Sequence, residues 1–274
     1  MTTTAGAPPV GNAGTLIRWW RERRSLTQLE LSGISEVSTR HLSYVETGRA
    51  RPSRRLILQL CEHLHVPLRR RNDILLAAGF APAYAEHRLA DTPLAAVNSA
   101  VTAILSAHEP LPALAVDGRW EMIAATSSVA ALTKRCAPAL LEPPVNVLRL
   151  SLHPDGMAPA IVNLGQWRAH LLSRLGAQVL AGGDPVLMEL LAELRGYPGG
   201  EEGGEHFGAT GPATQVLIPL RYRVDGTELS LLSTTTVFGT PTEITVSELA
   251  IEAFYPADAA TATALGLSPA RFPA

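Results

Sequence analysis

Four polar side chains between residues 39 and 44 have the types and spacing that suit hydrogen bonding to DNA bases. Thr39, Arg40, Ser43 and Tyr44 fall on one side of a predicted short helix, whereas Leu42 falls on the other. Hydroxyl and guanidinium groups near the start of a helix can reach base edges in the major groove. The pattern therefore predicts a surface that reads a DNA sequence.

The preceding residues predict how such a helix is positioned. Thr27, with Glu30 three residues later, predicts a capping box that starts a first helix. Ser38 predicts the N-cap of the second helix, and Leu31 and Val37 predict apolar contacts with a common core. A helix pair of this kind can place one helix in the major groove while the other crosses the DNA backbone.

These motifs resemble the Cro/repressor-type (XRE) helix-turn-helix family. The likeness rests on Thr27-Gln28, Val37-Ser38, Leu42, and residues 46–49 and 51–53. Together, the pattern and the resemblance predict one set of DNA-binding residues. They are Thr27, Gln28, Ser38, Thr39, Arg40, Ser43, Tyr44, Arg49 and Arg51.

The resemblance also implies individual roles. Gln28 is expected to hold a phosphate, and Arg49 and Arg51 are expected to meet the DNA backbone beyond the recognition helix. In that family a structural acid pairs with an arginine of the preceding helix, and Glu46 and Arg21 are the residues that match. The resemblance therefore implies a structural ion pair between Arg21 and Glu46.

One position departs from the family pattern. The inter-helix turn usually has glycine where this chain has Glu36, and Gly33 appears three residues earlier. A non-glycine residue in a left-handed turn costs ~1 kcal/mol. The departure allows a differently shaped turn and leaves the pose of the recognition helix open, whereas the helix itself is expected.

The alternative is an ordinary five-helix domain that binds no nucleic acid, and the distribution of charge argues against it. Residues 1–88 contain 13 arginines and 7 acidic residues, a net charge of +6, and the rest of the chain carries −8. The chain as a whole carries only −2. A basic domain joined to an acidic one is the asymmetry that DNA binding by one domain predicts.

The chain of 274 residues is long enough for two domains. We predict a flexible N-terminus (1–13), a five-helix domain (14–80), a linker (81–93) and a second domain (94–274). No secretory signal and no run of ~18 apolar residues is visible, so a cytoplasmic protein without a membrane partner is expected. Cys61 is expected to be a buried thiol, and because Cys61 and Cys136 are isolated, neither a disulfide nor a metal site is expected.

The second domain has the pattern of strands interrupted by helices. A hairpin is predicted around Asp117-Gly118, and a second one around Asp225-Gly226. Helices are expected at about 94–107, 127–135, 160–180 and 185–194, and a last strand at about 244–254. Two strands, a helical insert and three strands predict a PAS-like antiparallel sheet with flanking helices. The whole chain is therefore predicted to be α+β.

Residues 143–159, Asn163-Leu164, Trp167-Arg168 and residues 254–258 resemble the ligand-binding domain of MmyB-like regulators. This likeness runs from about residue 94 to about residue 265. It implies a PAS-like domain which, in at least one family member, holds a fatty acid. The expected ligand is a small apolar molecule, with a fatty acid as one candidate.

Large apolar side chains are the candidates for the lining of such a pocket. They are Trp120, Met122, Met157, Trp167 and Met188. Plain core packing remains the alternative for each of them. Residues 199–211, rich in glycine and glutamate, are either a lid over the pocket or an unstructured insertion.

The second domain shows no motif for catalysis. His153 and Asp155 flank a proline, which predicts a structural turn in preference to a metal site or a catalytic pair. No nucleophile elbow or phosphate loop is visible. The sequence therefore predicts a transcriptional regulator and no enzyme, with an operator DNA, an apolar ligand and a second copy of the chain as partners. Two rivals stay open: a C-terminal protein-interaction module without a ligand, and an enzyme with a DNA-binding domain.

Overall fold

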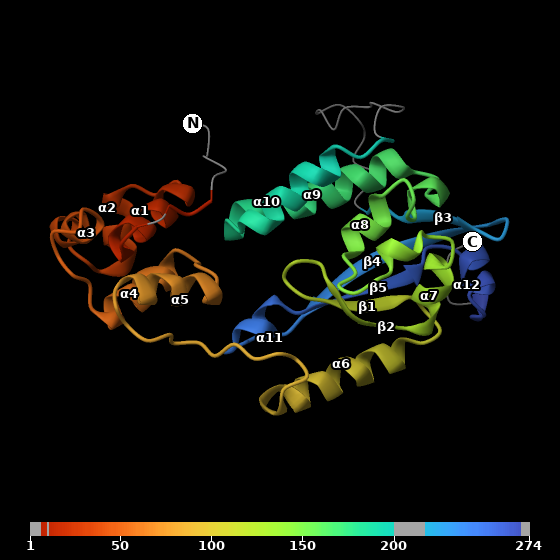
Figure 1. Ribbon diagram of the computed structural model, residues 1–274, viewed down its shortest axis with the longest axis horizontal. Helices are drawn as coiled ribbons and strands as arrows, with labels where there is room; N and C mark the ends of the chain where they lie inside the picture. Colours follow the sequence, from red (N-terminus) through yellow and green to blue (C-terminus); the bar gives the residue numbers. More distant parts are fainter. Residues whose placement is uncertain (1–6, 10, 200–216, 270–274) are drawn as a thin grey trace. The chain divides into compact units, whose positions relative to one another are not determined.

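The computed structural model describes residues 7–9, 11–199 and 217–269 (Figure 1). These residues form two compact units. The first contains the chain up to residue 87 with residues 178–188 and 241–247, and the second contains residues 88–177, 189–240 and those from 248 onward. Most of the predicted glycine-rich loop, and residues 1–6 and 10 of the predicted flexible N-terminus, lie outside the described residues.

Five helices make up most of the first unit. They are α1 (Ala13–Arg23), α2 (Gln28–Ser35), α3 (Thr39–Glu46), α4 (Arg54–His63) and α5 (Leu68–Ala77). Their apolar faces meet in one core, in which Ile17, Leu31, Leu42, Ile57 and Leu75 are completely buried. Burial of these side chains is the main source of stability for such short helices.

Side-chain caps define where these helices begin. Asn12, Thr27, Ser38 and Ser53 each accept a hydrogen bond from a backbone N–H in the first turn of α1, α2, α3 and α4. α2 ends at Glu36, whose φ of 54° and ψ of 29° are left-handed. The turn thus keeps the conformation that favours glycine, although the residue is glutamate.

A five-stranded antiparallel sheet forms the centre of the second unit. Its strands are β1 (Ala113–Val116), β2 (Met122–Ala125), β3 (Leu220–Val224), β4 (Thr227–Val237) and β5 (Ala250–Pro256), in the spatial order β2-β1-β5-β4-β3. β3 and β4 form the hairpin predicted at Asp225-Gly226, where φ is 48° and 83°. Two successive positive φ values are typical of a type I′ turn, which suits the twist of two strands.

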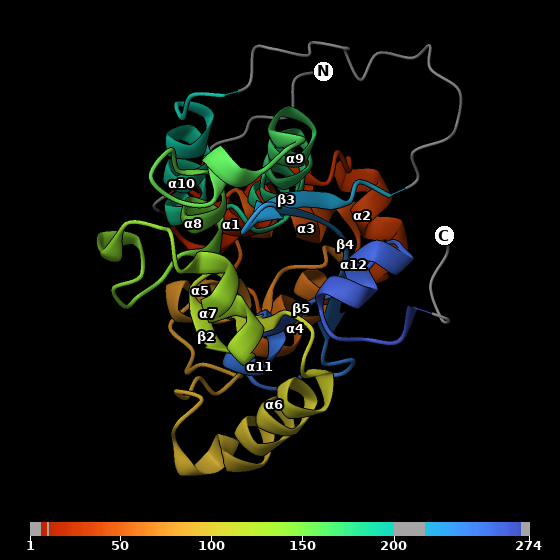
Figure 2. The same cartoon turned by 90° about the vertical axis from the view of Figure 1, so that its right-hand side faces the viewer.

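The two faces of this sheet have different coverings (Figure 2). Helix α6 (Ala95–His108) packs on one face, where Val101 and Leu105 contact a cluster that includes Ala115 and Ile251. Because side chains alternate along a strand, Leu114 and Glu252 point to the opposite face, where they line a pocket. Helices α7 (Ser127–Thr133), α8 (Val147–Leu152) and the first part of α9 (Leu164–Gly182) cover that face.

The remaining helices are α10 (Pro185–Arg195), α11 (Ile244–Glu248) and α12 (Ala259–Ala264). The prediction of one strand over 244–254 is wrong in its first half, because α11 precedes β5. Glu243 explains the difference, since its carboxylate accepts a hydrogen bond from the Val246 N–H at 2.8 Å. This local bond favours a helical turn over a strand. The sequence pattern also failed to predict α8 and α12, which are only six residues long.

Candidate DNA interface and ligand pocket

The predicted capping box positions the start of α2. The Thr27 N–H donates to Glu30 Oε2 at 2.7 Å, and the Glu30 N–H donates to Thr27 Oγ1 at 3.2 Å. The Thr27 hydroxyl also donates to Glu30 Oε2 at 2.7 Å, and the two bonds that Thr27 donates to this carboxylate, first the backbone one, lower its pKa. At α3, the Ser38 hydroxyl accepts from the His41 N–H at 3.3 Å. Thr27 and Ser38 thus fix where α2 and α3 begin.

Arg21 and Glu46 form a buried pair that joins α1 to α3. Arg21 Nε and Nη2 donate to the two carboxylate oxygens of Glu46 at 2.7 and 2.9 Å, and the two residues are only 7% and 5% exposed. Arg21 Nη1 also donates to the Leu26 carbonyl at 2.7 Å. Gln28 Nε2 donates to Glu46 Oε2 at 2.8 Å, so the pair also fixes the first residue of α2.

The exposed face of α3 brings Arg40 and Tyr44 together. The guanidinium of Arg40 lies over the Tyr44 ring, 5.4 Å from its centroid, and Arg40 Nε donates to the phenolic oxygen at 3.2 Å. The Thr39 hydroxyl donates to Ser32 Oγ at 3.0 Å, which ties the start of α3 to α2. Ser43 is partly exposed beside them. Arg40 is exposed on this face, whereas Tyr44, like Thr39, is partly exposed.

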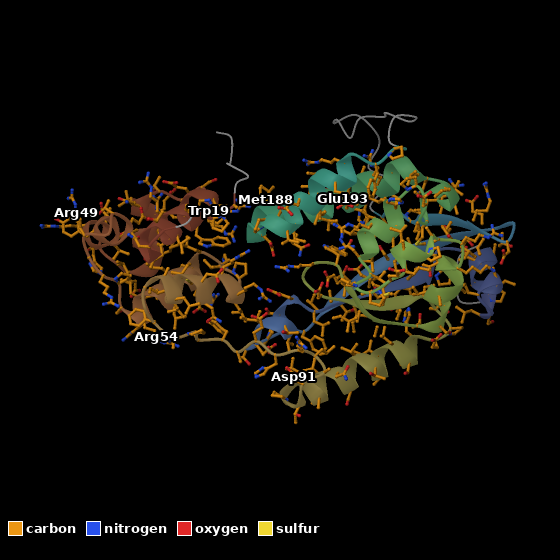
Figure 3. The ribbon with its side chains drawn as sticks, viewed as in Figure 1. Trp19, Arg49, Arg54, Asp91, Met188 and Glu193 are labelled. Carbon is orange, nitrogen blue, oxygen red and sulfur yellow. The ribbon has the colours of Figure 1, made fainter. Side chains whose placement is uncertain are left out.

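The two arginines beyond α3 have different surroundings. Arg49 is exposed and projects away from the helices (Figure 3). Arg51 is also exposed, but its Nη2 donates to the Ala78 carbonyl at 3.0 Å and its guanidinium lies 5.9 Å from the centroid of the Phe80 ring. Arg51 therefore also holds the end of α5, whereas Arg49 is oriented toward solvent.

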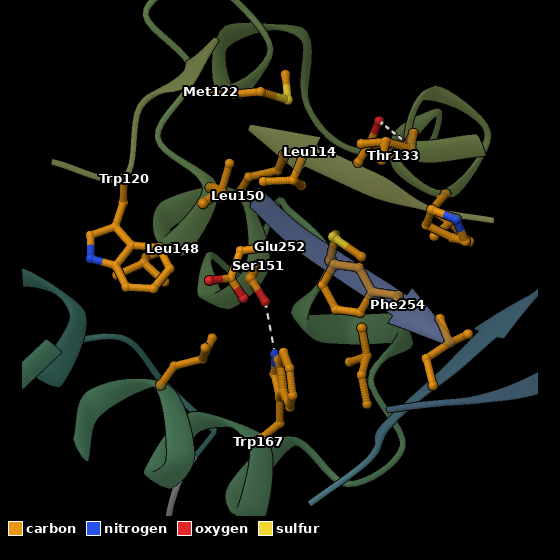
Figure 4. Close-up of a pocket in the computed structure, with 18 of the residues that line it drawn as sticks. Leu114, Trp120, Met122, Thr133, Leu148, Leu150, Ser151, Trp167, Glu252 and Phe254 are labelled. Carbon is orange, nitrogen blue, oxygen red and sulfur yellow. Dashed lines mark hydrogen bonds between the residues drawn. The ribbon is translucent and has the colours of Figure 1, made fainter. Parts of the chain in front are cut away.

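The second unit contains an apolar pocket between the sheet and helices α7, α8 and α9 (Figure 4). Its cavity has a volume of about 80 Å³. Trp167 on α9 points its indole nitrogen at Ser151 on α8, and Nε1 donates to Ser151 Oγ at 3.0 Å. Four of the predicted residues line the cavity, namely Trp120, Met122, Met157 and Trp167. Met188 does not line it, because it lies on the part of α10 that belongs to the first unit.

One ion pair lies in the mostly apolar wall. Arg174 Nη2 and Nη1 donate to Glu252 Oε1 and Oε2 at 2.8 and 3.1 Å. Arg174 Nη2 also donates to Thr235 Oγ1 at 2.8 Å, and the guanidinium lies 4.9 Å from the centroid of the Trp120 ring. The sequence pattern did not predict this pair. Glu252 itself could have indicated it, because it is an acidic residue within an apolar strand. Its side chain alternates with those of Leu249, Ile251 and Ala253, so it faces the other side of the sheet.

The histidine, aspartate and cysteine side chains considered as site candidates lie in a turn or in the core. His153 and Asp155 lie in a turn, where the Asp155 N–H donates to His153 Nδ1 at 3.0 Å. The described residues contain no group of three or more His, Cys, Asp or Glu side chains that could hold a metal. Cys61 and Cys136 are buried free thiols, and burial raises the pKa of Cys61 to about 12. Within the described ranges, no helix is long and apolar enough to cross a membrane.

Comparison with protein families gives two matches. Residues 13–74 match a helix-turn-helix domain, and residues 97–267 match the MmyB-like transcription regulator ligand binding domain. No curated protein matches the chain. The first match covers α1 to α4 and most of α5, and the second covers the sheet and the pocket described above. Because the second match covers more than half of the sequence, the chain belongs to the family of MmyB-like transcription regulators, with a helix-turn-helix domain ahead of its ligand-binding domain.

Proposed function

We propose that the protein binds an operator as a homodimer and changes its DNA affinity when a small apolar molecule enters the pocket. The observation that supports this most is the combination, in one chain, of an exposed basic helix-turn-helix face and an apolar cavity of about 80 Å³. No catalytic role is proposed, since the family is one of transcription regulators.

Base reading is assigned to the exposed face of α3. Stacking on the Tyr44 ring restrains the Arg40 side chain. Its guanidinium can then donate two parallel hydrogen bonds to a guanine. Thr39, Ser43 and Tyr44 complete this face. Tyr44 also offers its ring to a thymine methyl group.

Phosphate contacts are assigned to residues around α3. One N–H of the Gln28 amide is used by Glu46, which fixes the amide and leaves its second N–H for a phosphate. Arg49 supplies a charge that is oriented toward solvent, and Arg51 supplies a second one beside α5. Thr27 and Ser38 are the N-caps of α2 and α3. We assign the main-chain N–H groups at these two helix ends to the DNA phosphates as well.

Dimerisation follows from the size of a single recognition helix. One α3 covers about half of an operator, so two copies are expected on a pseudo-palindrome with half-site centres ~34–36 Å apart. Sedimentation of the full chain at micromolar concentration tests this proposal. A monomer that binds a single half-site as tightly as a palindrome would contradict it.

The pocket is proposed to open when the ligand enters. Its volume of about 80 Å³ is far below the ~300–1,000 Å³ of typical ligand sites. Met122 and Met157 line it, and flexible methionine side chains can move at small cost. A PAS-like sheet that binds an apolar molecule fits this arrangement, and a fatty acid remains one candidate because of the family resemblance.

Helix α9 is proposed to carry the signal. Trp167, Leu171 and Arg174 in its first part line the pocket. Its last turn belongs to the first unit, where Arg23 of α1 donates to the carbonyls of Leu180 and Val179 at 2.6 and 2.5 Å. A ligand that moves α9 would therefore act on α1. Such coupling is typically ~1–3 kcal/mol.

Native mass spectrometry of the full chain tests the ligand proposal. Selection from a pool of randomised DNA duplexes identifies the operator. A co-purified apolar molecule and an enriched palindrome are expected. Enrichment of a palindrome without any apolar ligand would favour the rival model, in which the second domain is a protein-interaction module.

A further inference from the structure

The pocket wall contains a charged pair whose two charges cancel. Arg174 and Glu252 both line the cavity, and two hydrogen bonds join them. The Glu252 side chain is only 6% exposed, and that of Arg174 is 27% exposed. The other lining side chains are apolar except for Thr133 and Ser151. A ligand in this cavity therefore meets no unbalanced charge.

We propose that the pocket selects an uncharged apolar molecule with a hydroxyl or carbonyl group, and that Glu252 excludes carboxylic acids. The inference rests on the proposed ligand-sensing function and specifies its ligand class. It departs from the fatty acid that the family resemblance suggests.

A carboxylate ligand has two ways to enter, and both are unfavourable. It can take the guanidinium of Arg174 from Glu252, which leaves a nearly inaccessible carboxylate without its cation. Alternatively it can bind beside the intact pair, where Glu252 already neutralises Arg174 and nothing compensates the ligand carboxylate for its lost hydration. The Thr235 hydroxyl, which donates to Glu252 Oε1 at 2.9 Å, further stabilises the carboxylate in its present position.

The neighbouring histidine offers no compensating cation. His170 precedes Arg174 by one turn of α9, and burial together with the positive charge of Arg174 lowers the pKa of its imidazole. His170 is therefore neutral at pH 7. A ligand carboxylate would have only the guanidinium that Glu252 already engages.

An uncharged polar group has a suitable partner in Ser151. This hydroxyl accepts a hydrogen bond from the Trp167 indole N–H, and its own proton has no acceptor within the described part of the chain. It can donate that proton to a hydroxyl or carbonyl oxygen of the ligand. Ser151 is 9% exposed, so such a bond would be shielded from water.

Calorimetry with octanol and octanoate, at about pH 8 and with the full chain, tests the proposal. The two probes share the alkyl chain and differ in the head group, and octanoate is ionised at this pH. We expect octanol to bind about tenfold more tightly or better. The comparison uses the wild-type chain, so it does not depend on whether a variant folds.

Two matched variants assign the preference to Glu252. Glu252→Gln removes the charge and keeps the shape, so it should shift the alcohol-to-acid ratio toward the acid by about tenfold or more. Glu193→Gln removes a carboxylate from the exposed pair with Arg149, which lies outside the pocket lining, and should leave the ratio unchanged.

The outcomes separate this inference from the function on which it rests. Octanoate binding at least as tightly as octanol would overturn the proposed selectivity, although the pocket would still be a ligand site. An unchanged ratio in Glu252→Gln would overturn the role of Glu252. Failure of every alcohol and every acid from butanol and butyrate to dodecanol and dodecanoate would overturn ligand sensing itself.

Discussion

The two units of this protein each contain an arginine–glutamate pair with short hydrogen bonds, but the surroundings of the pairs differ. Arg21 and Glu46 are both nearly inaccessible, and Leu26 and Gln28 satisfy further atoms of the pair. Arg174 and Glu252 border a cavity, and the arginine is partly exposed. The first pair joins helices, whereas the second forms the wall of a pocket. The same chemistry therefore supports a fold in one place and a proposed selectivity in the other.

The largest expected effect is the loss of the first pair. Glu46→Ala leaves the Arg21 charge buried without its partner and should destabilise the first unit by ~3–5 kcal/mol. Urea denaturation followed by circular dichroism should show an early helical transition. Arg18→Ala, which removes the 57% exposed partner of Glu22, should cost less than ~1 kcal/mol. Equal effects of the two variants would remove the distinction between buried and surface pairs.

Loss of the second pair should cost less. Glu252→Ala leaves Arg174 with Thr235, the Trp120 ring and partial access to water, so a loss of ~1.5–3 kcal/mol is expected. The same denaturation experiment should place this loss in the transition of the second unit. A loss larger than that of Glu46→Ala would mean that the second pair is chiefly structural.

On DNA, Arg40 and Arg49 should behave differently. Arg40→Ala should lose ~1–3 kcal/mol of binding and relax the preference at one base pair. Arg49→Ala should weaken all sequences alike and reduce the slope of affinity against salt by about one counterion. Binding to a randomised operator library at several salt concentrations separates the two. An unchanged preference in Arg40→Ala would show that the proposed register of α3 is wrong.

The smallest expected effect concerns the proposed link through α9. Arg23→Gln keeps a polar side chain but loses charged donors to the Val179 and Leu180 carbonyls. The coupling between ligand and operator is typically ~1–3 kcal/mol, and this variant should reduce it. The operator affinity of the ligand-free protein should change less than the coupling does. Arg18→Gln, on the exposed side of α1, is the control. Full ligand coupling in Arg23→Gln would exclude this route.

Local signals in the sequence predicted the first unit better than the second. The caps at Thr27 and Ser38 depend on hydrogen bonds within one turn, so their residue types alone indicate them. The positions of Arg21 and Glu46 came from a family motif that reflects tertiary contacts. The left-handed conformation of Glu36 shows that packing of α2 against α3 overcomes a local cost of ~1 kcal/mol.

The pocket depended on contacts between distant residues. Four of the predicted apolar residues line it. Residue type alone could not remove Met188 from the predicted lining, because that requires knowing that the first turn of α10 belongs to the first unit. The Arg174–Glu252 pair joins residues 78 positions apart and requires the register of β5. The start of β5 was equally hard to predict, since the bond from Val246 to Glu243 competes with strand pairing.

Operator affinity of the full chain, measured with and without a saturating apolar alcohol, tests the central claim most directly. The duplex is the palindrome enriched from a random pool, and calorimetry confirms occupancy of the pocket. A change of about 5–150-fold in the dissociation constant is predicted, which corresponds to ~1–3 kcal/mol of coupling. An identical dissociation constant with the pocket fully occupied would contradict a ligand-responsive regulator.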